Sequence, residues 1–175
     1  WHLGSSEPYQ PQSRGFDEFF GFLSGAHSYV VLQRGANNPL MDGRQPAASL
    51  TYLTDMLAER ADAFIGRNRG NRFFLYLAFN AVHTPLEAPE TYLARFPNIK
   101  NPERRTYAAM LSAMDDGVGR TMAALKREKL DEKTVVIFLN DNGGPTMPGT
   151  AINASSNGPL RGSKRQTWEG GIRVP

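Results

Sequence analysis

The chain has 175 residues, of which 40% are apolar, 21% are charged and 10% are aromatic. This composition excludes an intrinsically disordered chain and supplies enough apolar side chains for one globular core. The formal net charge of +3 is too small for a nucleic-acid-binding arm or a polybasic membrane anchor. No cysteine is present, which excludes disulfides, thiolate metal sites and a cysteine nucleophile within these residues. No apolar run approaches the roughly 20 residues of a membrane span.

The first part of the chain predicts loops, because residues 1–49 are rich in Gly, Pro, Ser, Gln and Asn and show little periodicity. Residues 29–32 form the one short apolar stretch here and are a candidate strand. Apolar side chains then recur at steps of three, four and one, the pattern of one face of an amphipathic helix. We expect Ser49 to cap this helix and Gly66 or Gly70 to end it. Its apolar face consists of Leu50, Leu53, Leu57, Ala61, Phe64 and Ile65.

Two continuous apolar runs, residues 73–79 and 134–139, predict strands buried on both faces, the kind found in parallel sheets covered by helices. Residues 103–129 lie between them, keep an apolar spacing of three and four, and end in basic side chains, which predicts a long helix. Such alternation of helices and strands is typical of an α/β fold with right-handed crossovers. The expected apolar face of the long helix comprises Tyr107, Met110, Leu111, Met114, Val118, Met122 and Leu125.

Polar turns follow both predicted strands, at residues 80–85 and 140–144. Ligands of open α/β sheets bind beyond the carboxyl ends of the strands, so parallel strands would bring these two turns to one edge. Asp141 and Asn142 offer a carboxylate and an amide oxygen, the donors that Ca²⁺ or Mg²⁺ prefers. The alternative is a simple turn, because Asp-Asn-Gly-Gly is also good turn chemistry.

Two further features could bind an anion or move a proton. His83 is followed by Thr-Pro in the first turn, and its imidazole is either a proton shuttle or a structural side chain. Arg161, Lys164 and Arg165 lie in a Gly-containing loop, which is either an anion site or a solvated basic loop. The loop lacks the phosphate-binding Gly-x-x-x-x-Gly-Lys-Ser/Thr pattern.

Two short patterns carry little functional weight. Asp115 and Asp116 are adjacent in the predicted long helix, so their carboxylates point about 100° apart and cannot act as a dyad. We expect them on a solvated face or at a cap. Asn153-Ala154-Ser155 matches the sequon for N-glycosylation, a pattern too short to be decisive.

Four separated motifs resemble, in order and spacing, the formylglycine-dependent sulfatases. They are Trp-His-Leu-Gly at residues 1–4, Val-His-Thr-Pro at 82–85, Asn-Asp-Asn-Gly-Gly at 140–144, and Leu-Arg-Gly-Ser-Lys with the later Trp-Glu-Gly-Gly at 160–171. Residues 14–21 and 114–119 also look like stretches of that family. The pattern is most similar to arylsulfatase B-like enzymes, which include N-acetylgalactosamine 4-sulfatases. The fold it implies is a mixed, mostly parallel sheet between helices, similar to alkaline phosphatase.

The resemblance also implies roles for five residues. Asp141 and Asn142 would be ligands of a Ca²⁺ ion that polarises a sulfate ester, and His83 and Lys164 would contact the sulfate oxygens. His2 would lie beside the formylglycine and help to expel sulfate from a covalent intermediate. The implied substrate is a sulfated small molecule or glycan. The implied partner of the full-length protein is the formylglycine-generating enzyme, and the implied location is secreted, periplasmic or lysosomal.

The chain departs from the family pattern at the nucleophile. Family members carry a Cys/Ser-x-Pro-x-Arg motif well before Trp-His-Leu-Gly, whereas this chain begins at Trp1 and has a Tyr in its Tyr-Gln-Pro-Gln-Ser stretch at residues 9–13. We therefore expect residues 1–175 to be the central part of a sulfatase catalytic domain and to be inactive alone. The alternatives are a related phosphodiesterase or phosphonate hydrolase, and a degenerate domain that binds sulfated glycans without cleaving them.

Overall fold

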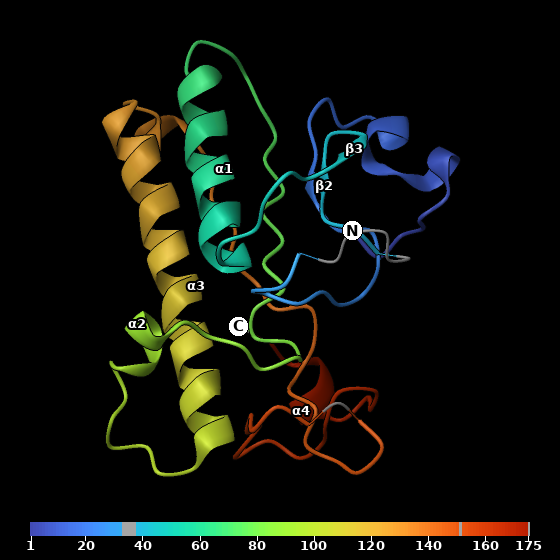
Figure 1. Cartoon of the computed structure of the whole chain (residues 1–175), viewed down its shortest axis with the longest axis vertical. Helices are drawn as coiled ribbons and strands as arrows, with labels where there is room; N and C mark the ends of the chain where they lie inside the picture. Colours follow the sequence, from blue (N-terminus) through green and yellow to red (C-terminus); the bar gives the residue numbers. More distant parts are fainter. Residues whose placement is uncertain (33–37, 151, 175) are drawn as a thin grey trace.

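The structure is a computed structural model that describes residues 1–32, 38–150 and 152–174. A small sheet and two short 3₁₀ helices lie on one side, two long helices lie on the other, and the extended run 73–79 passes between them (Figure 1). Loops around a short helix near the C-terminus complete the molecule (Figure 1). The elements in chain order are η1 (Glu7–Tyr9), η2 (Pro11–Arg14), β1 (Phe20–Gly21), β2 (Met41–Asp42), β3 (Gln45–Pro46), α1 (Leu53–Arg67), α2 (Glu90–Leu93), α3 (Pro102–Arg127), η3 (Asp131–Lys133) and α4 (Glu169–Ile172).

The two long helices confirm the predicted helices, with one corrected boundary. Helix α3 begins after Asn101, whose side chain accepts a hydrogen bond from the Arg104 amide at 2.8 Å, and it ends in basic residues that suit the helix dipole. Helix α1 begins after Tyr52, so the prediction of Ser49 as its cap is wrong. Tyr52 makes no side-chain capping bond and is buried instead, so core packing rather than capping fixes this end.

Helices α1 and α3 run parallel and pack through small residues. On α1 the predicted face is largely confirmed, since Leu53, Leu57, Ala61 and Ile65 are buried. The expected face of α3 is partly wrong, because Leu111 and Met122 are 43% and 41% exposed. The buried positions of α3 are mostly small, which lets the two backbones approach closely. They are Ala109, Met110, Ala113, Gly117, Ala124 and Leu125.

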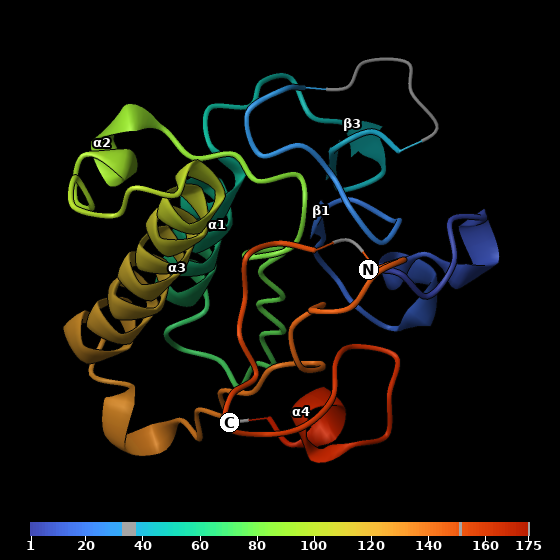
Figure 2. The same ribbon diagram turned by 90° about the horizontal axis from the view of Figure 1, so that it is seen from below.

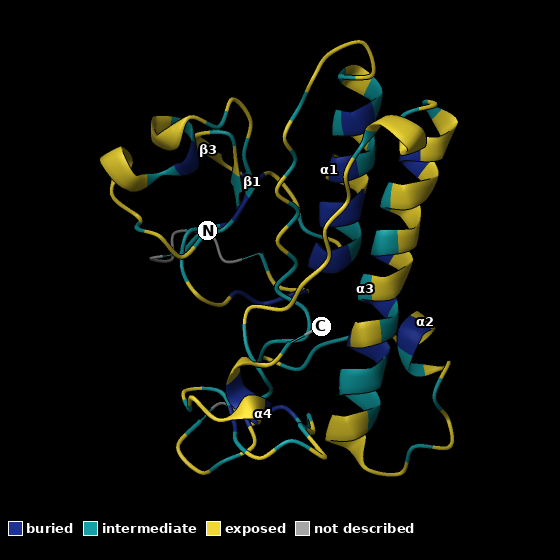
Figure 3. Ribbon diagram, turned by 180° about the vertical axis from the view of Figure 1, so that it is seen from behind, coloured by how far each residue is buried: buried dark blue, intermediate teal, exposed yellow. Residues whose placement is uncertain are grey.

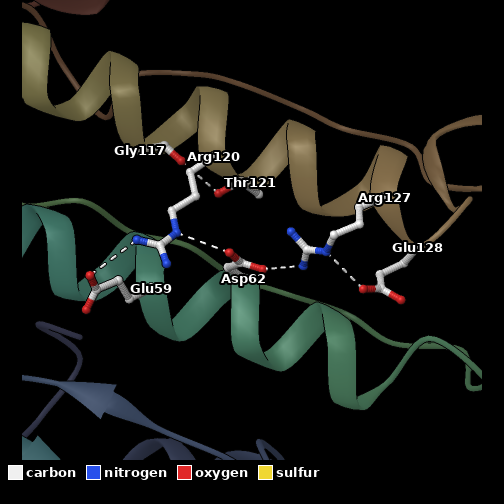
Figure 4. Close-up of polar contacts among 7 residues, drawn as sticks. All are labelled: Glu59, Asp62, Gly117, Arg120, Thr121, Arg127 and Glu128. Atoms are coloured by element: carbon white, nitrogen blue, oxygen red, sulfur yellow. Dashed lines mark hydrogen bonds and ion pairs between the residues drawn. The ribbon is translucent and has the colours of Figure 1, made fainter.

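An ionic cluster joins the solvent-facing edges of the same two helices (Figure 4). Asp62 of α1 accepts hydrogen bonds from Arg127 at 2.5 Å and from Arg120 at 3.1 Å, and Arg120 also contacts Glu59 at 3.2 Å. The hydrogen bond from Arg127 is the main cause of a lowered Asp62 pKa. Any stability from this pair is therefore present above the ordinary aspartate pKa and is lost as pH falls through the lowered value. Both guanidiniums are about half exposed, so solvent screening keeps the gain small.

A row of three tyrosines forms the centre of the larger core cluster. Tyr29, Tyr52 and Tyr92 stack in sequence with ring centroids 6.1 and 5.8 Å apart. Burial raises the pKa of Tyr52 to about 12 and raises that of Tyr29 further, so both hydroxyls stay protonated and can donate. Tyr92 donates to Asp55 at 2.8 Å, which ties α2 to α1. Tyr29 donates to the turn that carries His83, so the core directly supports a candidate site residue.

The prediction that residues 73–79 and 134–139 form strands buried on both faces is wrong for this structure. Both runs are extended, but within the described residues no backbone hydrogen bond joins either run to another segment. Residues 73–79 alternate, with Phe73, Leu75, Leu77 and Phe79 packed inward while Phe74 and Tyr76 are 74% and 62% exposed. Every apolar side chain of 135–139 is at least half exposed, as the yellow run in Figure 3 shows. Burial on both faces requires neighbouring strands, and none pairs with these runs in the described residues.

The sheet that does form is small and antiparallel. Its order is β1-β2-β3, with Phe20 opposite Asp42 and Met41 opposite Pro46. The candidate strand at residues 29–32 is not confirmed, because this stretch lies outside the assigned strands and Tyr29 is instead fully buried in the core. Among the described residues, no helix has both the length and the apolar character needed to cross a bilayer. The predicted mixed, mostly parallel sheet is thus not formed among these residues, while the helical layer is.

Changing Gly117 to Val should destabilise the chain by about 1–3 kcal/mol, because overpacking forces side chains and backbone apart. A Cβ at this position would lie 2.9 Å from the Phe79 ring and 3.2 Å from the Ala58 methyl group. The matched control is Gly119→Ala on the same helix, where nothing lies within 4 Å and helix propensity predicts a gain of up to about 1 kcal/mol. Urea unfolding measures both changes, and equal midpoints for Gly117→Val and the wild type would contradict this packing.

Candidate functional site

The turn that carries His83 is fixed by the buried Tyr29. The Tyr29 hydroxyl lies 2.6 Å from the carbonyl oxygen of Asn80 and 2.9 Å from that of His83, and the His83 amide closes the turn onto Asn80 at 2.8 Å. The His83 ring Nδ1 lies 2.8 Å from the Thr84 carbonyl oxygen. Because a carbonyl only accepts, Nδ1 carries the proton, and Nε2 is left to accept or donate toward a ligand.

The turn that carries Asp141 and Asn142 is held through its two glycines. The Gly143 amide donates to the Gly171 carbonyl at 3.0 Å, which ties the turn to α4. The Gly144 amide donates to the Asn157 side chain at 2.8 Å, and the Gly144 carbonyl accepts from the same side chain at 2.9 Å. A Cβ on Gly144 would lie 2.2 Å from the Ser155 hydroxyl oxygen, so only glycine fits there.

The loop with Lys164 belongs to the same hydrogen-bonded unit. The Lys164 amide donates to the Gly144 carbonyl at 3.1 Å, and Ser163, which is buried, donates to that carbonyl at 3.3 Å. Asn157 reaches across to the Gly162 carbonyl at 3.0 Å. Helix α4 and the loops of the described residues 140–150 and 152–168 lie beside the α1–α3 pair (Figure 2). A backbone hydrogen bond therefore joins the turn that carries Asp141 and Asn142 to the loop that carries Lys164.

A buried asparagine links this unit to the His83 turn. The Asn153 side chain donates to the Val82 carbonyl at 2.8 Å and accepts from the Ser155 amide at 3.2 Å. Asn153 is only 5% exposed and its amide makes these hydrogen bonds, so it is not accessible as a glycosylation acceptor. In this structure the asparagine of the sequon has a structural role, because it links the His83 turn to the rest of the candidate site.

His2 is held next to Leu23 and Gly25. Its amide donates to the Leu23 carbonyl at 2.9 Å, and its ring packs against Gly25, where a Cβ would lie 2.6 Å from the ring. The side chain is exposed, and within the described residues no hydrogen bond joins His2 to His83, Asn142 or Lys164. Asp115 and Asp116 are also exposed, as expected, and Asp116 pairs with Arg95 at 2.8 Å.

The donors at residues 141–142 fit part of a hard-cation site. Asp141 is exposed with no partner among the described residues, and Asn142 uses its amino group on the Gly143 carbonyl, which leaves its Oδ1 available. Two oxygen ligands are fewer than the six to eight that Ca²⁺ takes. In the described parts of the chain, no group of three or more His, Cys, Asp or Glu side chains could hold a metal ion. These residues can therefore contribute to a metal site but do not complete one.

Comparison with known proteins decides the family. The sulfatase family model matches residues 1–175. The chain belongs to the sulfatase family. Arylsulfatase J of Mus musculus is 39% identical over 99% of the chain, and N-acetylgalactosamine-6-sulfatase of Sus scrofa is 31% identical over all of it. The chain spans 30% and 35% of the lengths of these two relatives.

A solved structure supports the sulfatase fold. Ps i-CgsB in complex with k-i-k-neocarrahexaose is 39% identical and superposes with a TM-score of 0.91. The match covers the whole of this chain and 42% of that chain. The predicted family is therefore confirmed. The described helices and strands are arranged as in the corresponding part of Ps i-CgsB. The closer similarity to N-acetylgalactosamine 4-sulfatases stays a prediction.

Sequence reasoning missed the residues that position the site. Tyr29, Asn153, Asn157 and Ser163 hold the two turns and the basic loop, yet none belongs to a pattern with catalytic meaning. Their partners are backbone atoms, which leave no trace in the sequence. The one available signal was the pair of asparagines in the loop before the basic segment, because such side chains often bond to the backbone.

Replacing Asn157 with Ala should cost about 2 kcal/mol, because three neutral hydrogen bonds are lost and each contributes about 0.5–1.5 kcal/mol. The Gly144 amide should also lose its protection from hydrogen exchange, which mass spectrometry can follow. Ser156→Ala is the matched control, since Ser156 is exposed and accepts only a 3.3 Å bond from Gly158. Unchanged protection of the Gly144 amide in Asn157→Ala would show that this side chain does not hold the turn.

Proposed function

We propose that residues 1–175 form the central part of the catalytic domain of a sulfuric ester hydrolase that acts on aryl or glycan sulfates. The observation that carries this proposal is the hydrogen-bonded unit of the Asp141–Asn142 turn and the Lys164 loop in a chain of the sulfatase family. The neocarrahexaose bound to Ps i-CgsB supports a glycan as the substrate. The chain covers about a third of its relatives, so the activity belongs to the larger protein of which these residues would form part.

Lys164 and His83 would act on the sulfate ester itself. Hydrolysis adds water across the S–O bond and releases an alcohol and inorganic sulfate, so the leaving oxygen must take up a proton. The Lys164 ammonium has no ion pair among the described residues and can neutralise sulfate oxygens. The His83 Nε2 is available because Nδ1 is bonded to Thr84, and in its protonated form it can donate to the leaving oxygen.

His2 would supply a second proton-carrying group. Its assignment rests on the Trp-His-Leu-Gly motif, and its exposed ring on Gly25 is open to further neighbours. The formylglycine of the family would lie outside this chain and would supply the nucleophile. We further propose that the larger protein is a substrate of the formylglycine-generating enzyme and is secreted, periplasmic or lysosomal, as the family resemblance implies.

Asp141 and Asn142 would hold a Ca²⁺ ion together with ligands from outside the chain. The two oxygens point to a hard cation rather than a soft metal, and the absence of cysteine from the chain agrees with this choice. The ion would polarise the sulfate ester when bound. The Gly143 and Gly144 hydrogen bonds would keep both oxygens in place without using them as partners.

The larger protein should release 4-nitrophenol from 4-nitrophenyl sulfate, and the 175-residue chain alone should not, because it lacks the nucleophile. Lys164→Ala in the larger protein should lower kcat/KM by about 100-fold or more, the usual loss when one preorganised group that stabilises charge is removed. A continuous absorbance assay measures the hydrolysis rate of the larger protein, of its Lys164→Ala variant and of the 175-residue chain.

The matched control is Lys126→Ala, which removes an exposed lysine at the end of α3 and should leave kcat/KM unchanged. Turnover by the 175-residue chain would overturn the assignment of the nucleophile to another segment. Faster hydrolysis of a phosphate ester than of the sulfate ester by the larger protein would favour a phosphodiesterase instead.

Removing metal from the larger protein with a chelator should abolish hydrolysis, and adding Ca²⁺ should restore it better than Mg²⁺, which demands tighter octahedral geometry. Asp141→Ala should raise the Ca²⁺ concentration needed for half-maximal activity. Asp131→Ala, an exposed acid in η3, is the control and should not change it. Full activity in a metal-free preparation, verified by elemental analysis, would contradict the metal site.

A further inference from the structure

The segment between the Asp141 turn and α4 carries positive charges and no negative ones. Residues 142–168 contain Arg161, Lys164 and Arg165 but no Asp or Glu. The next acid along the chain, Glu169, is paired with Arg173 at 3.4 Å. None of the three cations has an ion pair among the described residues. Only one of them, Lys164, is needed for the proposed contact with the sulfate that is cleaved, so two positive charges are left without an assigned partner.

Arg161 is held in place although it is exposed. Its guanidinium lies over the Trp168 ring, 4.0 Å from the centroid, which is the shortest such contact in the described parts of the chain. Cation–π stacking occupies the face of the guanidinium and leaves the N–H groups at its edge free to donate. An exposed arginine normally loses side-chain entropy when it binds a ligand. Stacking on Trp168 already restricts the Arg161 side chain, so binding a ligand would cost less entropy.

The backbone keeps Arg161 and Trp168 together. The Gly170 amide donates to the Arg161 carbonyl at 2.7 Å, which closes the loop on itself. Gly162 has φ +113°, and a Cβ there would lie 2.5 Å from the Trp168 Cβ, so the peptide presses against the tryptophan. The same loop is anchored to the Asp141 turn by the Lys164 amide. The Arg161–Trp168 pair is therefore fixed relative to Lys164. Arg161 and Lys164 are three positions apart in the chain, so their Cα atoms lie at most about 11 Å from each other.

We propose that Arg161, stacked on Trp168, binds a second sulfate ester of the same substrate molecule, so that the preferred substrate is a glycan with more than one sulfate. This inference rests on the proposed sulfatase function and specifies its substrate class. A guanidinium edge presents paired N–H donors to a tetrahedral oxyanion, which an ammonium cannot do. Lys164 would contact the sulfate that is cleaved, while Arg161 would select substrates by a neighbouring sulfate that is retained.

The test compares two substrates of the larger protein, 4-nitrophenyl sulfate and a neocarrahexaose that carries several sulfate esters. Arg161→Ala should raise KM for the hexasaccharide about tenfold more than KM for 4-nitrophenyl sulfate, the loss expected for a charge-assisted hydrogen bond. Arg161→Lys should fall between Ala and the wild type because it keeps the charge but loses the planar fork. Arg14→Ala is the matched control, since Arg14 is exposed and also stacks on an aromatic ring, Tyr9 at 5.4 Å.

Each remaining outcome has a defined meaning. An equal rise of KM on both substrates would overturn the inference, because Arg161 would then contact the sulfate that is cleaved. No rise on the hexasaccharide would overturn it as well. If the wild type hydrolyses neither substrate, the proposed function fails, and calorimetric binding of the hexasaccharide then decides the inference alone. In that case about tenfold weaker binding by Arg161→Ala supports a sulfate-binding site, and equal binding refutes it.

Discussion

The carbonyl oxygen of Gly144 is the point on which the arrangement of the candidate site depends. It accepts from the Lys164 amide, the Asn157 side chain and the Ser163 hydroxyl, so one atom joins the Asp141–Asn142 turn to the basic loop. A side chain at this position would displace Ser155, which explains why the turn needs glycine here. Asp141 and Asn142 can keep their oxygens free for a cation because the backbone behind them carries the structural bonds.

The helices could be predicted from the sequence, but the sheet could not. Helix α3 combines an asparagine cap, a proline at its first position, regular apolar spacing and a basic end, so every local signal agrees. The sequence predicts Ser49 as the cap of α1, but the helix begins after Tyr52. Tyr52 has an extended backbone and packs between two other tyrosines, a contact that the local sequence does not indicate. Strand assignment depends on partners distant in sequence, and an apolar run such as 134–139 does not say whether those partners are present.

The candidate site residues belong to recognisable sequence motifs, whereas the residues that hold them do not. His83, Asp141, Asn142 and Lys164 occur in motifs whose residue types are set by what they would bind. The Tyr29 hydroxyl, by contrast, serves carbonyls 51 and 54 residues away, and Asn153 serves one 71 residues away. Any backbone carbonyl would satisfy these donors, so no spacing rule identifies the pairs in advance. The roles of the motif residues therefore stay predictions, while the residues that hold them could be found only from the structure.

The open extended runs also bear on how the chain behaves outside a larger fold. Residues 134–139 are uncharged, rich in β-branched side chains and free of proline, and their backbone donors and acceptors are unpaired within the described residues. Such a segment is a template for edge-to-edge association and aggregation. Lys133 and Asp141 flank it with opposite charges, and Arg72 precedes the second run at 73–79. Charges beside an apolar run oppose self-association, so at this surface only a few ionised side chains would limit it.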